Sequence, residues 1–153
     1  MTQTLSQIPP ETPGEGVRGF LPDHEGQQLY EWANQAAPVG PLLEIGSYCG
    51  RSTIWLGQAA KAHGAVVFAL DHHRGSEEHQ PGESHHDKAL IDTTGRFDSF
   101  GEFRRNIAAA DLEDTVIPIV ASSEVVGPYW QGGLGMVFID GGHSLDAALT
   151  DYR

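Results

Sequence analysis

Two acidic residues beside short apolar runs are the side chains best placed to do chemistry. Asp71 closes the run "VVFALD", and it lies 27 positions after Glu44 in the run "LLEIG". An acid at the end of a second strand, one strand–helix–strand unit after a glycine-rich turn, can hold a ribose diol by paired hydrogen bonds. The spacing therefore predicts a nucleoside-binding carboxylate at Asp71. The alternative is that Asp71 caps a turn or helix, as Asp often does.

A turn with two glycines separates Glu44 from the next predicted helix. Gly46 and Gly50 flank the letters "SYC", and Ser52 is among the first helical residues. Glycines let a ligand approach the main chain closely, and a helix N-terminus offers N–H groups to a carboxylate or phosphate. The spacing is Gly-x-x-x-Gly, which differs from the three-glycine loop that binds dinucleotides. An ordinary strand–helix turn that uses glycine for its geometry is the alternative.

An acid and a histidine follow another apolar run near the end of the sequence. Asp140 ends the run "MVFID", and His143 comes three positions later. Both side chains can point into one crevice, where the acid binds a metal or substrate and the histidine titrates near neutral pH. Mg²⁺ prefers oxygen ligands and keeps waters, so one Asp is plausible as a ligand but insufficient. The alternative makes Asp140 a helix cap and His143 a surface residue.

A polar segment rich in histidine and acids begins at Asp71 and reads "DHHRGSEEHQPGESHHDKALIDTTGRFD". Its position places it over the crevice, and no spacing within it matches a zinc site. We interpret it as a lid over the binding site or a wall of the pocket for the second substrate, with His72 and Arg74 expected to face a ligand.

The elements that must position these residues are short apolar runs that alternate with helical patterns. Near-continuous apolar runs are typical of parallel strands that are covered on both faces. The alternation predicts an α/β fold with a doubly wound, mainly parallel sheet and right-handed crossovers. The predicted strands are 41–45, 65–70, 116–120 and 136–139, and the predicted helices are 22–37, 52–63 and one that starts at a capping box of Ser99 and Glu102.

The order of the strands follows from one proline. Pro118 lies inside the third predicted strand, where it cannot donate a hydrogen bond, so that strand is expected at an edge of the sheet. The order 3-2-1-4 satisfies this requirement and opens a switch point between strands 1 and 4. Ligands of such sheets bind beyond the carboxyl ends of the strands at that point.

Composition limits the classes of partner. The chain has 153 residues, of which 39% are apolar, enough for one globular core. Its net charge of -12 disfavours nucleic acid and anionic membranes, and no apolar run approaches the ~18 residues of a membrane span. With no signal sequence and the single Cys49, a cytoplasmic location is expected. Residues 1–16 are expected to be a flexible arm that precedes a domain over 17–153.

Three motifs together give a family resemblance. "LLEIGSYCGRST", "FALDHHRGS" and "MVFIDGGHS" resemble the class I S-adenosylmethionine-dependent methyltransferases, in particular a small-molecule group with Ile-Asp-Gly-x-His after the fourth strand. The resemblance runs from about residue 41 to residue 153 and implies methyl transfer to a hydroxyl oxygen of a small-molecule acceptor. The implied cofactor-binding residues are Glu44, Gly46, Ser47, Gly50 and Ser52 near the methionine end, Asp71 at the ribose with His72 beside it, and Ala121 and Ser122 near the adenine.

The same resemblance assigns the chemistry and exposes one departure. In metal-dependent members of the family the residue that matches Asp140 is a metal ligand, which implies Mg²⁺, and His143 would accept the proton of the acceptor hydroxyl. The family has a seven-stranded sheet, whereas this sequence ends after the fourth predicted strand. We expect a fragment of a longer product; the alternatives are a homo-oligomer whose partner copy supplies the missing strands, and a chain that has lost catalysis. A non-catalytic nucleotide-binding module and an NAD-binding oxidoreductase domain also remain open.

Overall fold

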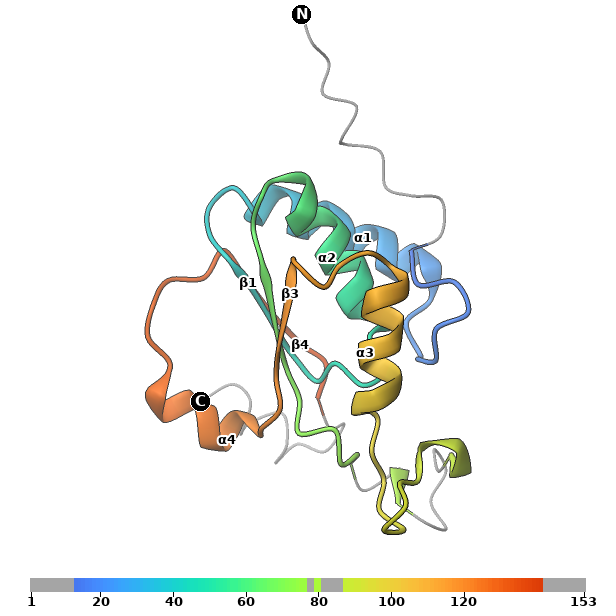
Figure 1. The fold of residues 1–153 in the computed structure, drawn as a ribbon. Helices are drawn as coiled ribbons and strands as arrows, with labels where there is room; N and C mark the ends of the chain where they lie inside the picture. Colours follow the sequence, from blue (N-terminus) through green and yellow to red (C-terminus); the bar gives the residue numbers. More distant parts are fainter. Residues whose placement is uncertain (1–12, 77–78, 81–86, 142–153) are drawn as a thin grey trace, which may run out of the picture.

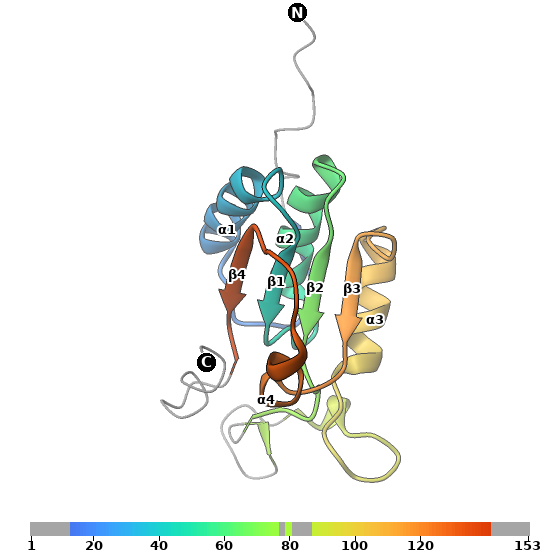
Figure 2. The same ribbon diagram turned by 90° about the vertical axis from the view of Figure 1, so that its left-hand side faces the viewer.

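The apolar runs form one parallel sheet, whose order is β3-β2-β1-β4. The computed structural model describes residues 13–76, 79–80 and 87–141. The predicted strand order is therefore confirmed, and all four arrows point the same way in Figure 2. The strands are β1 (Leu42–Ile45), β2 (Val67–Leu70), β3 (Val116–Ile119) and β4 (Met136–Ile139).

Pro118 lies in an edge strand, as the missing backbone N–H of proline requires. Pro118 pairs in register with Ala69 of β2, and β3 has no neighbour on its other side among the described strands. The missing N–H of proline therefore interrupts no ladder, because it lies at an edge. β1 is central, with Leu42 opposite Val67 of β2 and Met136 of β4.

Three helices cover one face of the sheet, as Figure 1 shows. They are α1 (Asp23–Ala36), α2 (Arg51–Ala62) and α3 (Phe100–Ala109). Trp55 of α2 is fully buried in the core beneath them. A β-carbon at Gly26 of α1 would overlap the ring of Trp55, so α1 and α2 can lie this close only because residue 26 has no side chain.

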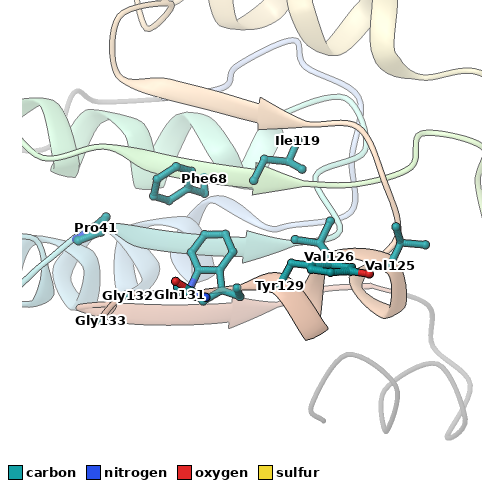
Figure 3. Close-up of a pocket in the computed structure, with 10 residues that line it drawn as sticks. Pro41, Phe68, Ile119, Val125, Val126, Tyr129, Gln131, Gly132 and Gly133 are labelled. Carbon is teal, nitrogen blue, oxygen red and sulfur yellow. The ribbon is translucent and has the colours of Figure 1, made fainter.

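The opposite face carries less cover within the described chain. Leu43, Ile45 and Leu70 pack there against a short segment made of α4 (Ser123–Val126), η4 (Gly127–Tyr129) and Trp130. This segment borders a cavity of about 690 Å³, whose lining includes Phe68 and Tyr129 (Figure 3). The rings of Phe68 and Trp130, which also lines the cavity, meet edge-on at a centroid distance of 5.2 Å. Val137 and Ile139 of β4 also belong to this face of alternating side chains, and they stay 48% and 38% exposed.

The predicted capping box at the start of α3 is wrong. Ser99 occupies the N-cap position, but its side chain makes no cap hydrogen bond. Its hydroxyl instead pairs with Nδ1 of His73 at 2.8 Å, and Glu102 accepts from Arg18. A partner brought close by folding has displaced the local one that the sequence pattern offered.

The chain before α1 is fastened to the start of α2. Arg51 donates to the carbonyl oxygens of Leu21, Gly14 and Val17, at 2.8, 3.3 and 3.0 Å. Residues 13–16, the last four of the predicted arm, form a turn beside it. Among the helices that the structure describes, none has the length and apolar character needed to cross a membrane.

Candidate functional site

The candidate site lies where the carboxyl ends of β1, β2 and β4 meet. Asp140 donates its backbone N–H to the carbonyl of Ile45 at 2.8 Å, and Gly46 donates to the carbonyl of Leu70 at 2.9 Å. These bonds continue the sheet one residue beyond the strands, so the acids that follow β2 and β4 lie at the same edge. The segment after β2, green to yellow in Figure 2, extends beyond the arrow tips. The switch point that the sequence predicted is therefore present.

Gly46 is required by the chain's own packing. Its φ is +91°, and a β-carbon there would overlap the carbonyl of Asp140 and lie 2.7 Å from the α-carbon of Gly141. Sequence reasoning explained this glycine by close approach of a ligand. The structure shows a close approach of the turn after β1 to the end of β4. Contact of a cofactor with Gly46 stays a prediction.

Gly50 serves the start of α2. It is the N-cap residue with φ +95°, and a β-carbon on it would lie 3.2 Å from Cδ2 of Phe103 in α3. Because Gly50 has no side chain, the N-cap residue makes no cap hydrogen bond to the first turn of α2. Its N–H groups therefore remain the kind of site that attracts a carboxylate or phosphate.

Glu44 is completely buried although it is ionisable. Its two carboxyl oxygens accept hydrogen bonds from the hydroxyls of Ser52 and Thr53 in the first turn of α2. Burial raises the pKa of Glu44 to about 7; the hydroxyl hydrogen bonds oppose this shift and the charge of Asp140 adds to it. Glu44 and Ser52, both predicted to bind cofactor, thus bind each other and fix the turn between β1 and α2.

The raised pKa of Glu44 predicts an unusual pH dependence. The folded protein binds this proton more tightly than the unfolded chain, whose pKa is near 4.5, so the contribution of Glu44 to stability falls as pH rises from about 4.5 to about 7. Glu44→Gln keeps the shape and never ionises. We expect the variant to be more stable than the wild type at pH 8, by on the order of 3 kcal/mol, with little difference at pH 5. Urea unfolding at both pH values measures this difference.

A matched control uses an exposed glutamate. Glu31 lies on the outer side of α1, and Glu31→Gln is expected to leave the pH dependence of unfolding unchanged. If Glu44→Gln shows the same pH profile as the wild type, the pKa of Glu44 is not raised by folding.

Asp71 is held tightly at the end of β2. Its Oδ2 accepts from the backbone N–H groups of Ser47 at 2.9 Å and Tyr48 at 2.8 Å, and its Oδ1 accepts from the N–H of His73 at 2.8 Å. A carboxylate offers about four acceptor positions, so these bonds leave room on Oδ1 for one further donor. The carboxylate is only partly buried, and a ligand hydroxyl is a donor of the right kind.

Tyr48 is a residue that the sequence reasoning passed over. It has a left-handed backbone, with φ +49°, and its ring stacks on those of His79 and Phe97 at centroid distances of 5.2 and 6.3 Å. Burial raises the pKa of its hydroxyl to about 12. The only sequence signal was its place between Gly46 and Gly50.

Described residues of the polar segment after β2 pack against this tyrosine. Leu90 and Phe97 are buried together with Cys49, which joins the segment to the turn after β1. His72 is exposed, whereas Arg74, also expected to face a ligand, pairs with Asp92 at 2.9 Å. The role of this segment as a lid or a pocket wall stays a prediction, because residues 77–78 and 81–86 lie outside the described residues.

The remaining predicted site residues lie around the same edge. Ser47 is buried at 2% exposure in the turn after β1. Ala121 packs against the second face of the sheet, and Ser122 begins α4, where its hydroxyl accepts from Val125 N–H at 3.3 Å. His143 lies outside the described residues.

The predicted metal site has one ligand in the described part of the chain. Asp140 is exposed at the end of β4. Within residues 13–76, 79–80 and 87–141, no three histidine, cysteine or acidic side chains gather closely enough to hold a metal ion. These residues do not fit Mg²⁺ by themselves, because the ion takes several oxygen ligands.

Comparisons with known proteins bear on the same region. Residues 43–153 match a family model described as a methyltransferase domain. Among solved structures, cofactor-bound Rv0187 from MTB is similar to this chain at 26% identity, with a TM-score of 0.50 and coverage of 75% of this chain and 43% of that one.

Two further structures share the fold. The SAH-bound methyltransferase of Podospora anserina has 16% identity, a TM-score of 0.60 and coverage of 86% of this chain and 47% of that chain. The O-methyltransferase of Bacillus cereus in complex with SAH has 21% identity, a TM-score of 0.55 and coverage of 83% and 49%. The chain thus spans less than half the length of each structure that it resembles.

Proposed function

This chain belongs to the family of methyltransferase domains, and we propose on that basis that it binds S-adenosylmethionine and serves methyl transfer to a small-molecule acceptor. The observation that carries the proposal is the Asp71 carboxylate. It lies at the end of β2, beside the crevice between β1 and β4, and it keeps an acceptor position for a ribose hydroxyl.

The turn after β1 offers a complementary site for the other end of the cofactor. The first turn of α2 has no side-chain cap, so its N–H groups suit the carboxylate of a methionine moiety. Ser52 and Thr53 hold this turn against buried Glu44. The residues present therefore fit the nucleoside and the amino acid part of S-adenosylmethionine.

The bound cofactor would supply a methyl group on a positively charged sulfur. The chain contributes binding and orientation, which lower the barrier by holding the reacting atoms together. We propose that Asp140, at the end of β4, orients the acceptor hydroxyl and that His143 accepts its proton. The proposed roles of Asp140 and His143 do not involve Mg²⁺, because the described residues do not assemble a set of ligands for this ion.

The choice of an oxygen acceptor is the finer part of the proposal. One of the structures with this fold is an O-methyltransferase. The wall of aromatic and polar side chains after β2, with Tyr48 and Phe97 stacked beside the crevice, gives a small organic acceptor a surface to lie against.

Calorimetry tests the cofactor class. We expect S-adenosylmethionine and SAH to bind to the 153-residue chain and NAD not to bind. Preference for NAD would overturn the proposal in favour of an oxidoreductase domain. Binding of SAH without turnover on a panel of hydroxylated small molecules would point to a non-catalytic module.

His143→Ala tests the proposed base. We expect methyl transfer, measured as SAH release, to fall by about 100-fold or more, the size of a general-base contribution, while the Kd for SAH stays within about twofold. If SAH binding falls in parallel with turnover, His143 has a structural role.

A further inference from the structure

His73 combines two features that rarely occur together. Its backbone is left-handed, with φ +61°, and its side chain is 1% exposed. A residue with a β-carbon adopts this conformation only when its surroundings hold it there, and such residues gather at functional sites.

The ring of His73 is anchored on the start of α3. Its Nδ1 lies 2.8 Å from the hydroxyl of Ser99, and the ring packs against those of Phe100 and Phe103 at centroid distances of 5.2 Å each. Nε2 is buried and has no hydrogen-bond partner in the described part of the chain. Three side chains of one helix start therefore fix the orientation of this imidazole.

The backbone of His73 connects this anchor to the candidate ribose site. Its N–H donates to Oδ1 of Asp71 at 2.8 Å, and its carbonyl accepts from the N–H of Ser99 at 3.0 Å. Asp71 in turn holds the N–H groups of Ser47 and Tyr48. A continuous path of hydrogen bonds thus runs from α3 through His73 and Asp71 to the turn after β1.

We propose that His73 is a positioning residue for Asp71: its ring, locked on α3, holds the main-chain N–H that aims the carboxylate at a ribose hydroxyl. The inference rests on the proposed function, because it assigns His73 a part in recognition of the ribose. It makes α3 a determinant of cofactor selectivity.

The positioning also depends on the charge of the ring. Burial lowers the pKa of His73, a shift that the charges of Asp71 and Asp98 oppose and that His72 assists. The other groups around the ring are Tyr48 from the turn after β1 and the uncharged Phe100 and Phe103 of α3. Burial favours the neutral form of the ring. Protonation, which becomes favourable in water below the ordinary histidine pKa of 6.5, therefore favours a conformation in which the ring has left its buried position. We therefore expect the Asp71 carboxylate to lose its orientation toward the ribose hydroxyl as the pH falls.

The test compares two ligands, SAH and the analogue of SAH that lacks both ribose hydroxyls. The ratio of their Kd values isolates the contacts of the two ribose hydroxyls, which the proposal assigns to Asp71, because the rest of the ligand is the same. We expect a ratio of about 10 to 100 for the wild type at pH 8, the size of a hydrogen bond to a charged group. His73→Ala is expected to bring the ratio close to one, and Ser99→Ala, which keeps the imidazole but removes its anchor, to lower it several-fold.

Two further measurements complete the test. His73→Asn tolerates the left-handed backbone and does not titrate, so it is expected to keep part of the ratio and to show no pH dependence. The wild-type ratio is expected to fall only as the pH drops below 6.5, because burial lowers the pKa of His73. His63→Asn is the control, because exposed His63 lies at the far end of α2 beside Asn34. It should behave as the wild type.

Each outcome separates this inference from the proposed function. If His73→Ala and Ser99→Ala weaken both ligands equally and leave the ratio intact, His73 is merely structural and the inference is overturned. A wild-type ratio that does not change with pH overturns the charge dependence. Failure of the wild type to bind SAH at all contradicts the proposed function instead.

Discussion

Gly46→Ala is expected to lower the free energy of unfolding by more than about 2 kcal/mol and to abolish measurable SAH binding. The left-handed backbone at φ +91° costs an alanine about 1–2 kcal/mol. Its methyl group would also overlap the carbonyl of Asp140 and approach the α-carbon of Gly141 to 2.7 Å, and backbone atoms cannot move aside without displacing β4. Urea unfolding and calorimetry measure the two effects.

Gly64→Ala is the matched control for this substitution. Gly64 follows α2 with φ +65°, and a β-carbon there meets nothing within 4 Å. The free energy of unfolding of this variant is expected to fall only by the conformational cost of alanine at this backbone, about 1 kcal/mol, and the variant is expected to bind SAH as the wild type does. Equal losses of stability at both positions would show that the contact between the turn and β4 does not matter.

Asp71→Asn is expected to weaken SAH binding by about 10- to 100-fold and to destabilise the fold by about 1–3 kcal/mol, although the two side chains have the same shape. The amide NH₂ must face either the N–H of His73 or the N–H groups of Ser47 and Tyr48. In either orientation the NH₂ group faces an N–H group, so that one donor meets another. At least one backbone N–H group is then left without an acceptor. Calorimetry with SAH and urea unfolding record both losses.

An aspartate remote from the crevice provides the comparison for Asp71. Asp111 pairs with Lys61 beyond the end of α3, and asparagine tolerates its left-handed backbone. Asp111→Asn makes the same change of charge and should leave SAH affinity unchanged. If Asp71→Asn binds SAH as tightly as the wild type, Asp71 does not contact the cofactor.

The chemistry of the crevice depends on two acids in opposite environments. Glu44 is sealed beneath α2, and burial raises its pKa, whereas Asp71 is partly exposed and surrounded by N–H donors. The first residue stabilises the turn between β1 and α2, and the second can meet a ligand. Glu44 lies inside β1 beneath a helix, whereas Asp71 lies just beyond the end of β2, and this difference in position sets the role of each acid.

The sequence by itself determined the sheet and the place of the site. Short apolar runs specify strands by local composition, and Pro118 specifies an edge because a missing N–H has the same consequence in any context. Once the order is known, residues that follow strands must meet at one edge. Asp71 and Asp140 could therefore be placed from their positions in the chain alone.

Only the tertiary structure decided the partners of the side chains. Ser99 was expected to cap α3, yet its hydroxyl binds His73, which lies 26 residues earlier. Gly46 leaves room for the backbone of Asp140 and Gly141 after β4, and Glu44 binds the first turn of α2. The physical reason is that side chains form hydrogen bonds and close contacts with the residues that packing brings near them. These partners can lie far away in the sequence, so local sequence patterns do not predict them.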